Sequence, residues 1–135
     1  MADTAGRCVL LADRHHGLSE GVRGLLETTF DSVFMVSDEA SLLEGTRRLL
    51  PPVVIVDLAL AAGDIDGLLG RVVARSPKSK VLVLTVHDEP NVAESALRAG
   101  AHAVVLTRAI ATDLLPAISA MLADQSYVSP AVRNR

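Results

Sequence analysis

Short runs of apolar residues alternate along the chain with stretches in which apolar residues recur every three or four positions. A short unbroken run rich in β-branched residues is typical of a strand buried on both faces, whereas the longer period indicates one face of a helix. The runs predict five strands, at residues 8–12, 33–36, 53–57, 81–85 and 103–106. A helical stretch follows each of them. Because such crossovers are right-handed, this (βα)5 order predicts an α/β fold, a doubly wound parallel sheet covered by helices on both faces.

Capping residues mark the ends of several predicted helices. Either Asp38 or Ser41 is placed to cap the second helix, and Gly100 suits the C-terminal cap of the fourth. Thr112 is predicted to cap the fifth helix, which would put Pro116 in its first turn, where a proline disturbs a helix least.

Polar residues stand where three of the predicted strands end. Asp13 follows the first strand, Asp57 closes the third and Thr85 closes the fourth. In parallel sheets the carboxyl ends of the strands are where ligands bind and chemistry takes place. The pattern therefore predicts two carboxylates and a hydroxyl at one edge of the sheet.

The composition narrows the class of protein. At 135 residues, with 50% hydrophobic and 2% aromatic residues, the chain is long enough for one domain with an aliphatic core. The net charge of −3 does not indicate that this domain binds the phosphate backbone of a nucleic acid. No apolar stretch approaches the ~20 residues of a membrane span, and residues 1–7 lack a signal-peptide pattern, so we expect a cytoplasmic protein. Residues 1–123 are predicted to form the domain, and residues 124–135, which are polar and broken by Pro130, a tail or the start of a linker.

Three segments, in this order and spacing, resemble response-regulator receiver domains of two-component signalling: residues 53–58 (VVIVDL), 81–89 (VLVLTVHDE) and 98–101 (RAGA). The resemblance implies a flavodoxin-like fold with strand order 2-1-3-4-5. Residues 85–89 (TVHDE) and 126–130 (SYVSP) look like the NarL/LuxR-type subclass, in which a linker and a helix-turn-helix DNA-binding domain follow the receiver. No such domain follows within these 135 residues, so we expect either a receiver separated from its output domain at the linker or one that stands alone.

The resemblance also implies roles for the strand-end residues. Asp57 matches the aspartate that accepts a phosphoryl group, and Thr85 matches the switch hydroxyl that moves to this group after transfer. Asp13 matches an acid that would hold Mg²⁺ together with Asp57 and the backbone carbonyl of Ala59, since Mg²⁺ prefers oxygen ligands. Each residue also has a simpler interpretation: a cap for Asp13, a turn cap for Asp57 and an ordinary strand residue for Thr85.

The function implied in this way is signalling, not enzymatic catalysis. A histidine kinase would phosphorylate Asp57, and the face formed by the fourth helix, the fifth strand and the fifth helix would signal to a transcriptional output. The sequence leaves open whether the chain forms a homodimer. DNA would be contacted only through the absent C-terminal domain.

Three positions depart from the family pattern. Arg14 stands where the family usually has a second metal-binding carboxylate, Thr107 where it has a lysine that contacts the phosphoryl group, and Val104 where it commonly has an aromatic residue coupled to the switch. A guanidinium cannot bind Mg²⁺. Arg14 would either point away and leave a weakened metal site, or lie between Asp13 and Asp57 and neutralise them.

Two other functions therefore stay open. The first is a pseudo-receiver, an interaction module that needs no phosphorylation because Arg14, Thr107 and Val104 have dismantled the chemistry. The second is a small flavodoxin-like binder or enzyme, which the sequence disfavours because residues 13–16 (DRHH) replace a glycine-rich phosphate loop. The four histidines at 15, 16, 87 and 102 have no metal-binding spacing, and Asp64 and Asp66 are predicted to be solvated loop acids.

Overall fold

The computed structural model describes residues 7–14 and 16–133, except for the side chains of residues 16–19 and 133. Its centre is a parallel sheet with the strand order β2-β1-β3-β4-β5-β6. The strands are β1 (Cys8–Ala12), β2 (Ser32–Val36), β3 (Val53–Asp57), β4 (Lys80–Thr85), β5 (Ala103–Leu106) and β6 (Tyr127–Val128). The predicted order 2-1-3-4-5 is therefore confirmed, and a sixth strand extends it.

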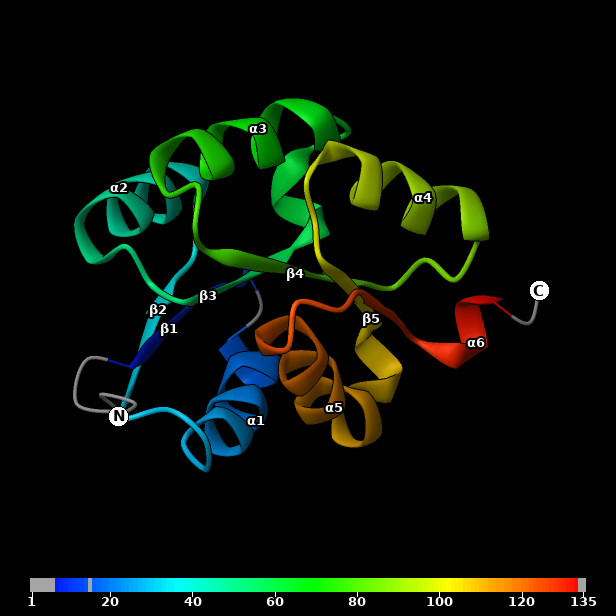
Figure 1. Cartoon of the computed structure of the whole chain (residues 1–135), viewed down its shortest axis with the longest axis horizontal. Helices are drawn as coiled ribbons and strands as arrows, with labels where there is room; N and C mark the ends of the chain where they lie inside the picture. The colour runs from blue at the N-terminus through cyan, green and yellow to red at the C-terminus, as the bar shows by residue number, and fades with distance from the viewer. Residues whose placement is uncertain (1–6, 15, 134–135) are drawn as a thin grey trace.

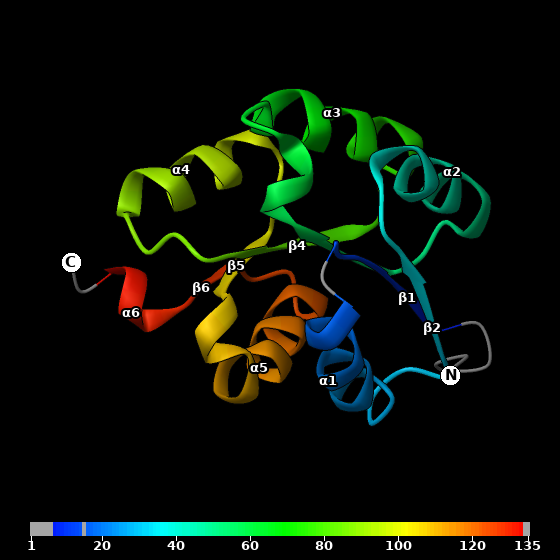
Figure 2. The same cartoon turned by 180° about the vertical axis from the view of Figure 1, so that it is seen from behind.

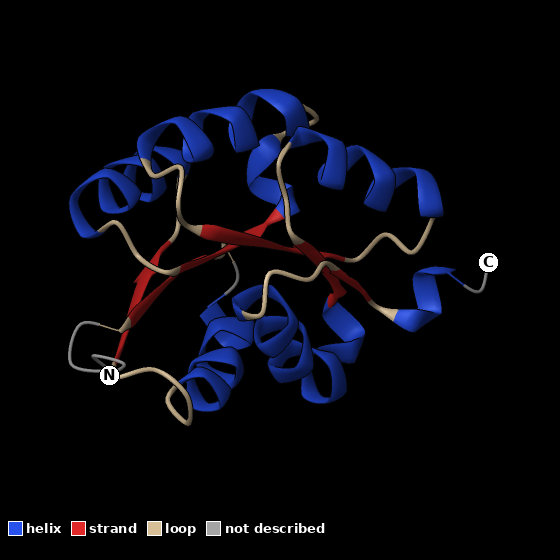
Figure 3. Cartoon of the chain, viewed as in Figure 1, coloured by secondary structure: helices blue, strands red, loops and turns tan. Residues whose placement is uncertain are grey.

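Helices cover both faces of the sheet, as predicted (Figures 1 and 2). One layer contains α1 (His16–Leu26) and α5 (Ile110–Leu122), and the other contains α2 (Glu39–Leu49), α3 (Ile65–Arg75) and α4 (Pro90–Ala99). The colouring by secondary structure makes the three layers plain (Figure 3). The fold is thus the doubly wound α/β arrangement that puts strand ends and loops at one edge.

Side-chain alternation along the strands divides the core into two apolar clusters. In β3, Val54 and Val56 belong to the cluster under α2, α3 and α4, whereas Val53 and Ile55 belong to the cluster under α1 and α5. All four are fully buried. This burial explains why the strand is an unbroken apolar run, since a central parallel strand faces helices on both sides.

The helix caps settle which of two residues caps α2 and correct the expectations for Thr112 and Pro116. Asp38 caps α2, because its carboxylate accepts a hydrogen bond from the Ser41 backbone N–H at 2.7 Å. The prediction that Thr112 caps the fifth helix is wrong: a 3-10 turn, η3 (Thr107–Ala109), leads directly into α5 at Ile110. The hydroxyl of Thr112 donates to the Ala109 carbonyl instead. Pro116 consequently lies inside α5 and not in its first turn, with an exposed side chain.

The polar C-terminal stretch contains structure that the sequence did not reveal. β6 pairs with β5, and the short helix α6 (Pro130–Arg133) follows β6 and contacts α4 (Figure 1). The Val132 side chain is almost completely buried. Two strand residues and a single apolar anchor are too short a pattern to distinguish from a linker. That residues 124–135 begin a linker remains a prediction.

Candidate functional site

The carboxyl ends of four strands lie at one edge of the sheet. Asp57 is the last residue of β3 and Thr85 the last of β4, whereas Asp13 and Thr107 directly follow β1 and β5. Ala12 pairs with Val56 across β1 and β3, so Asp13 and Asp57 each stand one residue beyond a paired position. Since neighbouring strands run ~4.8 Å apart, the backbones that carry these two acids are adjacent.

A cleft opens at this edge, with a volume of about 640 Å³. Asp57, Thr85 and Thr107 line it, together with Ala59 and His87 from the loops after β3 and β4. The structure thus brings together the predicted acceptor, the predicted hydroxyl and one of the three departures. Asp13 lies beside this edge and is only 2% exposed.

Asp57 shapes the turn that leaves the sheet. Its Oδ1 atom accepts a hydrogen bond from the Ala59 backbone N–H at 3.0 Å, which caps the 3-10 turn η2 (Leu58–Ala61). The turn-cap interpretation of Asp57 therefore describes a real contact. It fixes the orientation of the carboxylate at the mouth of the cleft, which a reactive group also requires.

Thr85 is buried, and a loop contact orients its hydroxyl. Its Oγ1 atom accepts a hydrogen bond from the His87 backbone N–H at 3.0 Å. A hydroxyl that accepts one bond still has its own O–H to donate. Thr85 is therefore not merely a β-branched packing residue, because its polar atom organises the loop that forms one wall of the cleft.

The three departures lie in different environments. Arg14 is exposed, Thr107 is half-buried in the cleft wall and Val104 is buried in the core. Arg108, next to Thr107, forms an ion pair with Asp88 at 3.2 Å and so ties the start of α5 to the loop after β4. Sequence reasoning missed this pair, because only the fold brings the two loops together.

The donor atoms at this edge are of the kind that binds Mg²⁺, but only two of them, the carboxylates of Asp13 and Asp57, carry a negative charge. Asp13 and Asp57 supply carboxylates and Ala59 a backbone carbonyl, and hard oxygen donors of this kind suit Mg²⁺, which keeps several waters. Within residues 7–14 and 16–133, no group of three or more His, Cys, Asp or Glu side chains is arranged to hold a metal. The histidine pair at 15 and 16 lies outside the residues whose side chains are described.

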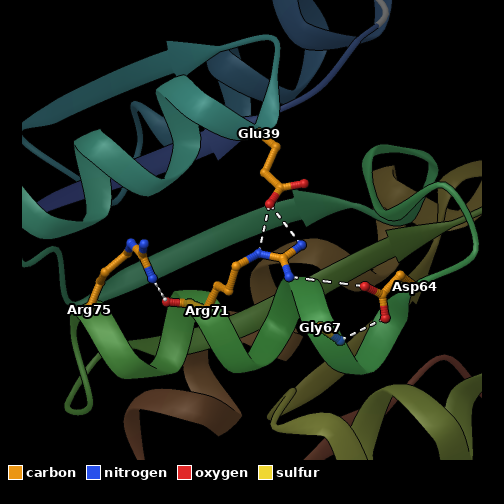
Figure 4. Close-up of polar contacts among 5 residues, drawn as sticks. All are labelled: Glu39, Asp64, Gly67, Arg71 and Arg75. Atoms are coloured by element: carbon orange, nitrogen blue, oxygen red, sulfur yellow. Dashed lines mark hydrogen bonds and ion pairs between the residues drawn. The ribbon is translucent and has the colours of Figure 1, made fainter.

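Asp64 and Asp66 are both exposed, as predicted for solvated acids, and Asp64 also supports α3. Asp64 caps α3 by accepting a hydrogen bond from the Gly67 backbone N–H at 3.0 Å (Figure 4). A Cβ atom at position 67 would clash with this carboxylate, which explains the glycine. Asp64 also lies 4.0 Å from Arg71, whose guanidinium contacts the Glu39 carboxylate on α2 at 2.8 Å (Figure 4). These contacts fix the far side of the loop that carries Ala59.

The fold first defines a class, a flavodoxin-like α/β domain whose polar residues gather at the carboxyl edge of the sheet. Within that class, the family model of the response regulator receiver domain matches residues 9–119, and the chain belongs to this family. No helix among the described residues has the length and apolar character needed to cross a membrane.

Individual relatives agree with this family. The transcriptional regulatory protein DegU of Brevibacillus brevis is 26% identical over 128 residues, which cover 93% of this chain but only 54% of that protein. A two-component response regulator of the LuxR family from Aurantimonas sp. SI85-9A1 matches with a TM-score of 0.84 and 25% identity, covering 94% of this chain and 92% of that one. RcsB of Salmonella enterica serovar Typhimurium, bound to promoter P1flhDC in the presence of the phosphomimetic BeF3-, matches with a TM-score of 0.79 and 25% identity, covering 96% of this chain and 65% of that one. The predicted resemblance to receivers of the NarL/LuxR type is confirmed, and the chain spans just over half the length of DegU.

Proposed function

We propose that this receiver domain accepts a phosphoryl group on Asp57 from a histidine kinase and passes the signal to a transcriptional output. The observation that carries the proposal is the position of Asp57 in the cleft, at the end of β3 and beside Thr85 and Thr107. The family of the chain and the family of its relatives, which are transcriptional regulators, support the same function.

The transfer is a substitution at phosphorus. A carboxylate oxygen of Asp57 forms a bond to phosphorus while the bond from phosphorus to the kinase histidine nitrogen breaks, which leaves an acyl phosphate on the protein and a free imidazole on the kinase. Catalysis of this step consists mainly of positioning and of neutralising the charge on the phosphoryl oxygens. The Ala59 N–H holds the carboxylate in place, and the Thr85 hydroxyl is a hydrogen-bond donor within the same cleft.

Asp13, Asp57 and the Ala59 carbonyl would hold a magnesium ion. When bound, this ion supplies positive charge to the phosphoryl oxygens. Arg14 contributes no ligand, and Thr107 donates at most a neutral hydrogen bond where a lysine would bring a full charge. We therefore expect slower transfer and weaker Mg²⁺ binding than in a receiver with both groups.

The relatives suggest which other molecules this protein would contact. RcsB is bound to a promoter in the matched structure, so an output domain that follows this receiver would contact DNA, while the receiver itself contacts the kinase. The α4–β5–α5 face would signal to that domain, and a second copy of the chain is a candidate partner. Regulators of this kind act in the cytoplasm, where we place this protein.

Intact-mass spectrometry after incubation with acetyl phosphate, with and without Mg²⁺, tests the proposal. We expect a Mg²⁺-dependent mass increase of one phosphoryl group, absent in Asp57→Asn, because the amide that replaces the carboxylate is a far poorer nucleophile. Asp66→Asn is the matched control, since Asp66 is an exposed acid of α3, and it should be labelled like the unmodified chain. A folded chain that gains no phosphoryl group while an active receiver is labelled in parallel would contradict the proposal and leave the pseudo-receiver.

A further inference from the structure

Ser129 joins the C-terminal segment to β5 through two hydrogen bonds and to α5 through a third. Its backbone N–H donates to the Val104 carbonyl at 2.9 Å, and its hydroxyl oxygen accepts from the Leu106 N–H at 3.0 Å. The same hydroxyl donates to the Asp113 carboxylate, on the first turn of α5, at 2.7 Å. Ser129 is fully buried, so each of these bonds would be costly to lose.

One of these bonds is made by Leu106, which lies one residue from the cleft. Leu106 is the last residue of β5, pairs with Thr85 across the sheet, and directly precedes Thr107, which lines the cleft. Thr107 is the next residue along the backbone, so a displacement of Thr107 is transmitted to Leu106 directly through the chain. Without the Ser129 hydroxyl this fully buried amide would lack the acceptor that the structure gives it.

The segment that Ser129 anchors is short and lies at the edge of the sheet. β6 has two residues, and the Tyr127 N–H contacts the His102 carbonyl at 3.2 Å. Val132 inserts into the core beside α4, and the Asp124 turn that begins the segment has a positive φ of 62°. Short elements at the edge of a sheet are the kind that open below the global unfolding limit, even when single side chains such as Val132 are buried.

We propose that Ser129 couples the state of the cleft to the docking of residues 127–132, hereafter the C-terminal strap, on β5. The proposal rests on the proposed phosphorylation of Asp57. A phosphoryl group on Asp57 recruits the hydroxyls of Thr85 and Thr107, the end of β5 moves with Thr107, and the bonds of Ser129 break. The strap then leaves β5 and exposes the strand edge and the Asp113 carboxylate. This route replaces an aromatic switch, because Val104 contributes its carbonyl to Ser129 and has no ring to rotate.

Hydrogen exchange on the full 135-residue chain, paired with intact mass, tests the coupling. After acetyl phosphate and Mg²⁺ have produced the adduct, exchange at the amides of Leu106, Tyr127 and Ser129 should rise about tenfold or more, while Ile55 in β3 stays protected. Ser129→Ala should show the fast exchange without phosphorylation, and phosphorylation should add nothing further. Ser126→Ala, which removes an exposed hydroxyl from the same segment, should behave like the unmodified chain.

The outcomes separate the coupling from the proposed function. An adduct on Asp57 with unchanged exchange at the strap overturns the coupling and leaves the function standing. No adduct overturns the function and the coupling with it. If the strap of the Ser129→Ala variant still loosens only after phosphorylation, the proposed role of Ser129 is overturned. Should Ser129→Ala fail to fold, Asp113→Asn weakens one bond of the same serine and should give an intermediate rise in exchange.

Discussion

Arg14 places a permanent positive charge directly after Asp13, at the edge where the cleft lies. Its side chain is exposed, while that of Asp13 is buried, so the two neighbours differ in both charge and solvation. Coulomb interactions near a protein surface amount to several kcal/mol gross at close range and much less after solvation is counted. We therefore expect the side chain at this position to influence how tightly the edge would bind Mg²⁺.

Arg14→Asp should tighten Mg²⁺ binding about tenfold or more, because it replaces a nearby cation with a third carboxylate. Isothermal titration calorimetry with MgCl₂ measures the change. Lys78→Asp is the matched control: it makes the same change of charge at an exposed site in the turn before β4, away from the carboxyl edge. Equal affinities in Arg14→Asp and Lys78→Asp would mean that Arg14 does not limit the site.

At the scale of elements, α5 shows how tertiary context overrides a local signal. Thr112 and Pro116 together predict a helix that begins three residues later than it does, because the η3 turn after β5 leads directly into α5 at Ile110. Pro116 is tolerated because it faces solvent, but it cannot donate a backbone hydrogen bond to the preceding turn.

Pro116→Ala should raise the free energy of unfolding by about 1–3 kcal/mol, because alanine restores a helical hydrogen bond and removes the ring clash. Part of that gain is offset, since proline also restricts the unfolded chain. Urea denaturation measures the difference. Pro90→Ala makes the same substitution at the first position of α4, where proline is favourable, and should leave stability unchanged or slightly lower. A gain in Pro90→Ala as large as that in Pro116→Ala would refute the explanation.

The difference between local sequence patterns and contacts made only in the folded chain explains what the sequence could and could not predict. The buried runs at 8–12, 53–57 and 103–106 predicted strands, because burial on both faces favours an unbroken apolar run, whereas the strand order came from the resemblance to receiver domains. Asp13, Asp57 and Thr85 could be assigned to one edge from their places at the strand ends. The contacts between Arg108 and Asp88 and between Arg71 and Glu39 could not be predicted, since they join residues 20 and 32 positions apart. The strap was missed because two strand residues leave almost no periodic signal.

At the scale of the whole molecule, one histidine links stability to pH. His102 lies at the start of β5, and its Nδ1 atom accepts a hydrogen bond from the Val81 backbone N–H at 3.0 Å, which only the neutral ring can do. Burial, and next the Lys80 ammonium, hold the pKa of His102 below its ordinary value of 6.5. Asp124, which is paired with Lys80, acts in the opposite direction.

Since the unfolded chain binds this proton more readily than the folded one, stability should fall as the pH decreases below about 6.5 and level off under the folded-state pKa. His102→Asn keeps an acceptor near Val81 but does not titrate, and should lose less stability between pH 7.5 and pH 5.5. Urea denaturation at both values checks this. His87→Asn, at an exposed histidine, is the control and should follow the unmodified chain. A variant that loses as much stability as the unmodified chain over this range would rule out His102 as the cause.

The strap described at β5 has a further consequence for solubility. An unpaired strand edge is a template for pairing with another chain, and Ala103–Leu106 is short, apolar and uncharged, the composition of aggregation-prone segments. While β6 is docked, its two residues pair with β5 and cover that edge. A state in which the strap is released is therefore also the state most exposed to self-association. The resting domain should stay monodisperse at concentrations where chains without residues 127–132 form oligomers.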